Sequence, residues 1–141
     1  MYQSLQGNIG LSKAIDYFTS HGYTVSIPLN DTQKYDLVVE IENKNLARVS
    51  VKTSRNIGPS GAYSVQLRNT GGGGANGGKV RQIAFDNTSC DFVFIYTGND
   101  DIYLIPTNEI LATNAISVGN KYTEFKVKNK LFSEWIIDNL E

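Results

Sequence analysis

Residues 35–53, which read YDLVVEIENKNLARVSVKT, are the stretch that decides the fold. The segments 35–41 and 46–53 are rich in β-branched residues, and the polar turn 43–45 separates them. This pattern predicts two strands joined as a hairpin. Because side chains alternate along a strand, each segment should gather its apolar residues on one face. The predicted apolar face consists of Leu37, Val39, Ile41, Val49 and Val51.

The polar residues of this hairpin fall on its other face. If the apolar residues share one core, Asp36, Ser50 and Lys52 lie together on the opposite side. The Asp36 carboxylate is a hard oxygen ligand that suits Mg²⁺ or Mn²⁺. Lys52 would position or deprotonate an attacking water and offset negative charge on a phosphate. The same two residues would also suit an ordinary cross-strand ion pair, and the residues alone leave both interpretations open.

The segment before the hairpin predicts a helix followed by a strand. Its apolar residues follow the i, i+3, i+4, i+7 spacing of an amphipathic helix, which we expect over about residues 8–21. These apolar positions are Leu11, Ala14, Ile15 and Phe18. Gly22 then suits the helix end, and residues 23–27 alternate as a strand does.

The segments after the hairpin add more strands, a loop and a second helix. Strands are predicted at 63–68, 91–96 and 102–106, with an edge strand at 122–127. Residues 91–96 are apolar on both faces, so that strand should be central. Residues 71–78 read GGGGANGG and predict a flexible loop. Thr107 is expected to N-cap a short helix, and residues 130–140 to form a C-terminal helix.

Length and composition favour one mixed α/β domain over residues 1–141, without repeats. The chain has 141 residues, of which 40% are apolar and 19% charged. One cysteine, Cys90, excludes an internal disulfide and a cysteine-cluster zinc site. One histidine, His21, excludes histidine-rich metal sites. No apolar run suits a membrane helix and the first residues lack signal-peptide features, so we expect a cytoplasmic, intracellular protein.

The charge distribution indicates a nucleic-acid partner. Residues 43–85 hold seven basic and no acidic residues, whereas the rest of the chain carries a charge of −8. Such a basic face is typical of proteins that bind nucleic acid, although an uneven, solvated surface would give the same counts. The segment 73–79 resembles a P-loop, but Val80 stands where a Ser or Thr should follow. The residues that we expect to contact DNA are Arg55, Arg68, Lys79 and Arg81.

Four stretches of the chain together resemble a known family. They read GNIGLSKAIDYFTSHGYTVSIP (7–28), YDLVVE (35–40), RVSVKTSR (48–55) and DFVFIYTGNDDIYLIP (91–106). In this order they resemble the PD-(D/E)XK nuclease superfamily, and within it the small homing endonucleases associated with group I introns. The resemblance covers about residues 6–106. It implies a restriction-endonuclease-like fold, with a mixed central sheet flanked by helices, and site-specific, metal-dependent cleavage of double-stranded DNA by a dimer or tetramer.

Some positions of this sequence match the site residues of the family, and others differ from them. Asp36 falls on the family's metal-binding aspartate and Lys52 on its catalytic lysine, and the carbonyl of Val51 is a candidate metal ligand. Ser50 stands where such enzymes usually have Glu or Gln, and its hydroxyl can hold a water beside the ion. Leu11 stands where Glu is common and cannot act as a ligand. Glu40 shares the face of Asp36, but four residues along a strand is about 13 Å, too far to chelate one ion with it.

The sequence is compatible with three functions. The first is a homing-type endonuclease, and the second is a Holliday-junction-type resolvase of the same fold. The third is a catalytically weakened DNA-binding module, which the altered positions Leu11 and Ser50 would favour. The sequence does not specify the DNA target or the choice between dimer and tetramer. It also does not specify a host element, such as a phage or other mobile element.

Overall fold

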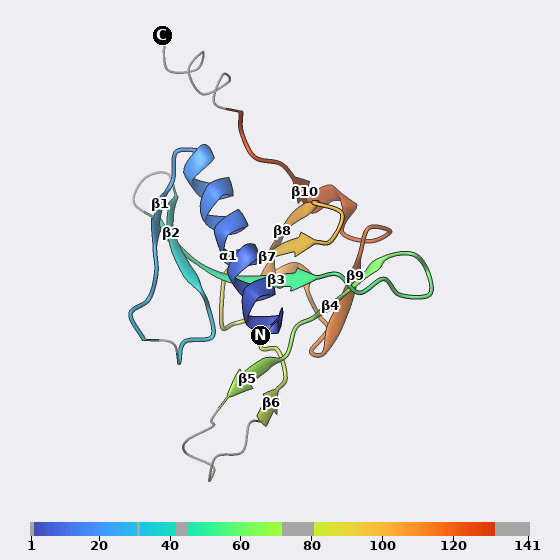
Figure 1. Ribbon diagram of the computed structural model, residues 1–141. Coiled ribbons are helices and arrows are strands. Elements are labelled where there is room, and N and C mark those ends of the chain that lie inside the picture. The colour runs from blue at the N-terminus through green and yellow to red at the C-terminus, as the bar shows by residue number, and fades with distance from the viewer. Residues whose placement is uncertain (1, 31, 42–44, 72–80, 132–141) are drawn as a thin grey trace.

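The computed structural model describes residues 2–30, 32–41, 45–71 and 81–131 of the chain (Figure 1). One long helix, α1 (Tyr2–Ser20), precedes all the strands. The strands are β1 (Thr24–Ser26), β2 (Leu37–Ile41), β3 (Asn45–Ser54), β4 (Tyr63–Gln66), β5 (Asn69–Gly71), β6 (Arg81–Ile83), β7 (Phe92–Thr97), β8 (Ile102–Pro106), β9 (Ala115–Val118) and β10 (Lys126–Val127). Short 3₁₀ turns span Thr107–Glu109 and Thr123–Phe125. Among the helices so described, none has the length and apolar character to cross a membrane.

A six-stranded sheet forms the centre of the molecule, in the order β1-β2-β3-β7-β8-β10. All neighbouring pairs are antiparallel except β3 and β7, which run parallel, so the sheet is mixed as predicted. The predicted hairpin is confirmed, because β2 pairs with β3 and Leu37 lies opposite Val49. The strand predicted to be central is also confirmed, since β7 lies between β3 and β8.

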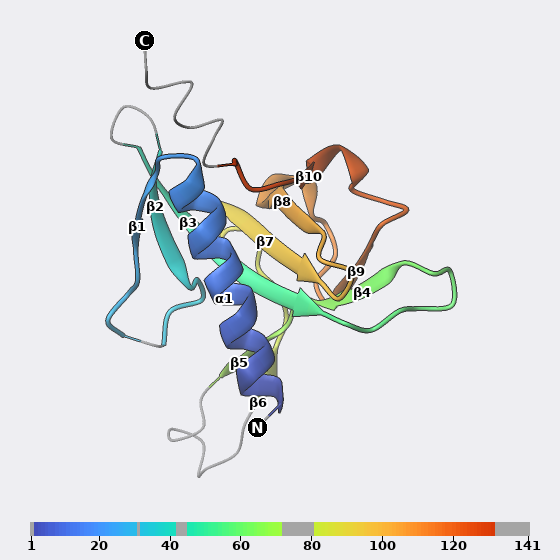
Figure 2. The same ribbon diagram turned by 45° about the horizontal axis from the view of Figure 1, so that its top comes forward.

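The sheet carries a different layer on each face. Helix α1 covers one face, where it lies across the sheet (Figure 2), and its Ala14 and Phe18 pack against Val49 and Phe94. The antiparallel ribbon of β4 and β9 covers the other face. Because β7 is buried on both sides, its residues alternate between the two cores. The core on the β4–β9 side contains Val65, Leu67, Phe85, Cys90, Val93, Ile95, Tyr103, Ile105, Ile110, Ile116 and Val118.

Helix α1 begins six residues earlier than the apolar stripe predicted. Its first turns lie close to the side chains of β3 because Gly10 has no side chain of its own. A Cβ at Gly10 would lie 2.1 Å from Thr53 Cγ2, which is far inside van der Waals contact. The Gln6 amide then donates to the carbonyl and hydroxyl oxygens of Thr53, at 3.4 and 3.3 Å. Tertiary contacts thus support a helical segment that has little apolar periodicity of its own.

Several predicted elements differ in detail. Thr107 is not an N-cap: Pro106 holds that position, and the Thr107 hydroxyl donates to the Cys90 carbonyl at 2.8 Å. The predicted edge strand is shortened to β10, because a 3₁₀ turn occupies the residues before it. Strands β5, β6 and β9 were not predicted. Residues 132–140 of the predicted C-terminal helix and residues 72–78 of the glycine-rich loop lie outside the described residues.

Candidate active site

The Asp36 carboxylate is held against the backbone of β3. The Asp36 N–H donates to the Val49 carbonyl at 2.8 Å, and the Val51 N–H donates to Asp36 Oδ2 at 2.7 Å. These two bonds flank Ser50, so Asp36 lies beside the segment Val49–Val51 as the hairpin prediction required. The side chain of Asp36 is exposed. A carboxylate fixed by one backbone bond and open to solvent can still take a further partner.

Beyond Val49, β3 has no strand partner on the β2 side among the described residues, because β2 begins at Leu37. Backbone groups of successive strand residues point to opposite edges. The carbonyls of Arg48 and Ser54 accept from Asp91 and Gly98 on the β7 side, at 2.8 Å each. The Val49 carbonyl points the other way, to Asp36. The carbonyl of Val51 therefore lies on the same edge as the Asp36 carboxylate.

Lys52 extends from the sheet face opposite α1. Its ammonium group donates to Asn69 Oδ1 at 3.0 Å, and the residue is partly buried. Burial lowers the pKa of the Lys52 ammonium, and the negative charge of the nearby Asp36 acts against this shift. The Asp36 carboxylate therefore lies close enough to Lys52 to favour the charged form of the lysine.

Asp36 and Lys52 do not form an ion pair. The ion pairs among the described residues are Arg48–Asp91 at 3.4 Å and Lys126–Asp101 at 3.2 Å. The interpretation of Asp36 and Lys52 as an ordinary cross-strand ion pair is therefore wrong. Both charged groups keep the capacity to contact a third group.

Ser50 shares the sheet face of Lys52, but it is only 2% exposed. Next to it lies the buried Cys90, whose thiol contacts the Ser50 backbone N–H. Burial raises the pKa of the Cys90 thiol, and hydrogen bonds from Ser89 and Ser50 act in the opposite direction. Ser50 and Cys90 are thus buried neighbours beneath the site.

The two altered family positions make the set of acidic ligands small. Leu11 is partly buried and packs against the core beneath α1. Glu40 is exposed and lies opposite Leu46, near the far end of β2. No three His, Cys, Asp or Glu residues come together in the described part of the chain. Among the described residues, Asp36 is thus the carboxylate that this site offers.

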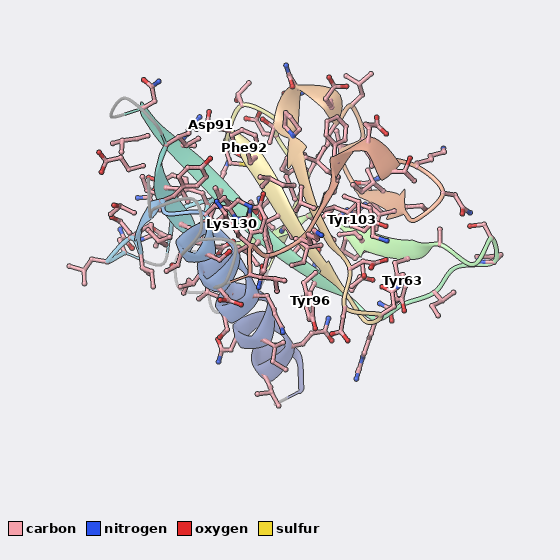
Figure 3. All side chains as sticks on the ribbon, turned by 90° about the horizontal axis from the view of Figure 1, so that it is seen from above. Tyr63, Asp91, Phe92, Tyr96, Tyr103 and Lys130 are labelled. Atoms are coloured by element: carbon pink, nitrogen blue, oxygen red, sulfur yellow. The ribbon has the colours of Figure 1, made fainter. Side chains whose placement is uncertain are left out.

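The structure separates the basic residues of the window 43–85 into different roles. Arg48 has a structural role, because it pairs with Asp91 directly before β7. Figure 3 shows Asp91 at one end of this strand and Tyr96 near the other. Arg68 is exposed, and its Nε donates to Asn114 Oδ1 at 2.9 Å. Arg55 is exposed directly after β3, where it lines a pocket with Gln6. Lys79 lies outside the described residues. Arg81 is the first residue of β6, and its side chain is not described.

Sequence reasoning missed two polar residues that contact β3, one on each face of the sheet. Gln6 lies one helical turn before Gly10, so helical spacing would have placed both on one face. It was overlooked because the helix was expected to begin at about residue 8. Asn69 carried no signal, because it follows a predicted strand and precedes a glycine-rich segment. Its contact with Lys52 depends on where the chain places the first residue of β5, 17 residues after Lys52.

Comparisons with known proteins identify the family and support the fold. A family model described as PD-(D/E)XK endonuclease matches residues 1–135. Among solved structures, the chain is similar to "a bacterial homing endonuclease: I-Ssp6803I", with a TM-score of 0.71 and 23% sequence identity. That match covers 96% of this chain and 91% of the other. It supports the restriction-endonuclease-like fold. No curated protein matches the chain.

Proposed function

The chain belongs to the PD-(D/E)XK endonuclease family, and we propose that it hydrolyses phosphodiester bonds in double-stranded DNA with the help of Mg²⁺ or Mn²⁺. We further propose that cleavage is site-specific and of the homing type. One observation carries the proposal: the Asp36 carboxylate accepts the Val51 N–H at 2.7 Å, directly beside Lys52 in β3. A carboxylate and a lysine at adjoining strand positions, not paired with each other, suit metal-assisted hydrolysis of a phosphate ester.

The donor set fits a small, hard cation. The Asp36 carboxylate and the Val51 carbonyl would hold the ion, and both are oxygen donors on one edge of β3. Mg²⁺ is commonly held by only one or two carboxylates, with water and substrate phosphates completing its shell. When bound, the ion supplies Lewis-acid polarisation of the phosphate. The small number of acidic ligands is therefore compatible with this cation.

Each residue of the site has a proposed role. Lys52 places a positive charge at the phosphate, where it would stabilise the charge that develops during hydrolysis and orient the attacking water. Partial burial strengthens this effect, because the surroundings screen the charge less than water does. Ser50 is proposed to support the site from beneath, since its side chain is buried.

Binding of DNA is proposed to use the basic window. Arg55 and Arg68 are exposed, and Lys79 and Arg81 belong to the same acid-free segment. Contacts from these residues to phosphates would position the duplex and make binding sensitive to salt. Cutting both strands requires two active sites, so we propose a dimer or tetramer whose symmetry would also extend the recognised sequence.

Cleavage of supercoiled plasmid DNA that contains candidate target sites tests this function. We expect Mg²⁺-dependent cutting that EDTA abolishes, and a loss of at least about 100-fold in Asp36→Asn and Lys52→Met. Glu40→Gln and Lys121→Met are matched controls that change the same charges at exposed positions away from the site. Wild-type cutting by either site variant would exclude these assignments. Fragments of discrete size would support site specificity, whereas preference for a four-way junction would identify a resolvase.

A DNA-binding module with weakened catalysis is the second candidate. The observation that favours it is the packing of Leu11 in the core and the burial of Ser50. Both family positions that usually add a polar ligand are thus used for packing. In that case the protein would retard a DNA duplex in a gel-shift assay and leave plasmid uncut with either Mg²⁺ or Mn²⁺.

A further inference from the structure

We propose that Asn69 is a positioning residue that fixes the Lys52 ammonium group over the site, a role that rests on the function proposed above. The contact is direct, since Lys52 Nζ donates to Asn69 Oδ1 at 3.0 Å. It joins β3 to the first residue of β5, 17 residues further along the chain. Both residues are partly buried.

A lysine needs such a partner to act at a defined point. Its side chain is long and flexible, and it loses rotamer entropy when it is fixed. A partly buried ammonium group also needs an acceptor, because an unsatisfied charge away from water is costly. Among the described residues, the Asn69 oxygen is the hydrogen-bond acceptor of Lys52. The Asn69 amide therefore orients the Lys52 ammonium group and also compensates for its burial.

The neutral character of the acceptor suits the proposed role. A carboxylate at this position would pair with the lysine and cancel the positive charge that a phosphate should meet. The amide oxygen accepts one hydrogen bond and leaves that charge uncompensated. Asn69 thus holds Lys52 without neutralising it.

Asn69 is itself well anchored. Leu67, two residues earlier, is fully buried, and its N–H donates to the Asn114 carbonyl at 2.9 Å. Asn69 then pairs with Ile83 in the antiparallel β5–β6 ribbon. The amide oxygen is consequently presented from a fixed backbone on the β4–β9 side of the sheet. Groups placed in this way are more precise than groups on loops.

Steady-state cleavage kinetics of three variants test the inference. Asn69→Leu removes the acceptor at similar volume, and we expect kcat to fall by about 100-fold with KM for DNA unchanged. Asn69→Asp keeps an acceptor oxygen but adds a charge, so its kcat should lie between those of the wild type and Asn69→Leu. Asn120→Leu is the control, because it alters an exposed amide that contacts the Ser60 carbonyl. Equal kcat in Asn69→Leu and the wild type would overturn the inference.

A measurement without DNA separates this inference from the proposed function. Relaxation of the Lys52 ¹³Cε nucleus reports the order of its side chain in the free, full-length protein. We expect lower order in Asn69→Leu and wild-type order in Asn120→Leu. Unchanged order in Asn69→Leu would refute positioning even if the protein cuts DNA. A wild type that cuts no DNA would refute the function, while the relaxation data would still decide whether Asn69 fixes Lys52.

Discussion

Ser50 is a residue at which burial predicts a measurable effect. Its side chain is 2% exposed, so Ser50→Glu would place a carboxylate out of water. We expect this variant to lose about 3 kcal/mol of unfolding free energy in EDTA, measured by thermal unfolding. If Asp36 holds a divalent ion, Mg²⁺ should raise the melting temperature of Ser50→Glu more than that of the wild type. Ser50→Ala is the control, since it removes the hydroxyl and adds no charge.

A wild-type melting temperature for Ser50→Glu in EDTA would contradict the placement of this side chain. The new carboxylate would then reach solvent. That result would require a different register between β2 and β3, because a shift by one residue exchanges the two faces of a strand.

The Arg48–Asp91 pair predicts how stability depends on pH. Burial alone would raise the pKa of Asp91, but hydrogen bonds from the Arg48 N–H, at 2.7 Å, and its guanidinium lower that pKa overall. A lowered pKa in the folded state means that the stabilisation is present above pH 4 and lost as pH falls through the folded-state value. Both side chains are 42% exposed, so screening limits the effect to below about 1 kcal/mol.

Chemical denaturation of Asp91→Asn between pH 7 and pH 2 measures this effect. We expect the variant to be less stable than the wild type at pH 7, with the difference shrinking as the solution becomes acidic. A difference that stays constant over the whole range would show that the charge of Asp91 contributes nothing.

For single residues of the site, the sequence was informative where the contacts are local. Asp36, Ser50 and Lys52 could be brought together because a hairpin with a short turn relates them through strand alternation alone. The partner of Lys52 could not be found in this way. Asn69 reaches Lys52 through a backbone path that depends on the burial of Leu67, and neither residue carries a pattern that reports it.

The close approach of α1 to β3 predicts opposite effects for two helical glycines. Gly10→Ala would bring a Cβ to 2.1 Å from Thr53 Cγ2, so we expect a loss of about 1–3 kcal/mol of unfolding free energy. Gly7→Ala is the matched control. Its Cβ would meet no atom within 4 Å, and the higher helix propensity of alanine should add up to about 1 kcal/mol. Urea denaturation of both variants measures the two changes.

Thr53→Ser in the Gly10→Ala background identifies the cause. Serine keeps the hydroxyl that Gln6 contacts and lacks the methyl group that the new Cβ would strike. Most of the lost stability should therefore return. Failure of Thr53→Ser to restore stability would show that the helix does not lie against β3 at this point.

Among the elements, strands with strong patterns were predicted and weakly patterned ones were not. Strands β2, β3, β7 and β8 are rich in apolar, β-branched or aromatic residues, so their sequences reveal them. Strands β5 and β6 have three residues each. Strand β9 is held by pairing with β4, where Tyr63 lies opposite Val118. Short strands stabilised by distant partners leave little local signal.

The charge distribution of the whole molecule predicts that DNA binding depends on salt. Few of the described residues carry this effect. Arg48 is paired with Asp91 and Lys52 belongs to the site, which leaves Arg55 and Arg68 as the exposed arginines of the basic window whose side chains are described. In the double variant Arg55→Ala/Arg68→Ala, the slope of log Kd against log salt should fall by up to about 1.8, or about 0.9 per lost phosphate contact. Fluorescence anisotropy with labelled duplex DNA measures this slope.

The control for this experiment removes the same charge elsewhere. Lys121→Ala/Lys128→Ala changes two exposed lysines outside the basic window. Its slope should equal that of the wild type. Equal slopes for both double variants would indicate that DNA does not contact Arg55 and Arg68.

The parallel pairing of β3 with β7 has a consequence for the order of events during synthesis. Arg48 and Asp91, which connect the two strands, are 43 residues apart, whereas β2 and β3 are adjacent hairpin strands. Non-local pairs form late, because a long loop must close first. A nascent chain therefore carries Asp36 and Lys52 well before β7 exists to pair with β3 in the sheet. We expect incomplete chains leaving the ribosome to lack nuclease activity, which would protect the cell's DNA from unfinished protein.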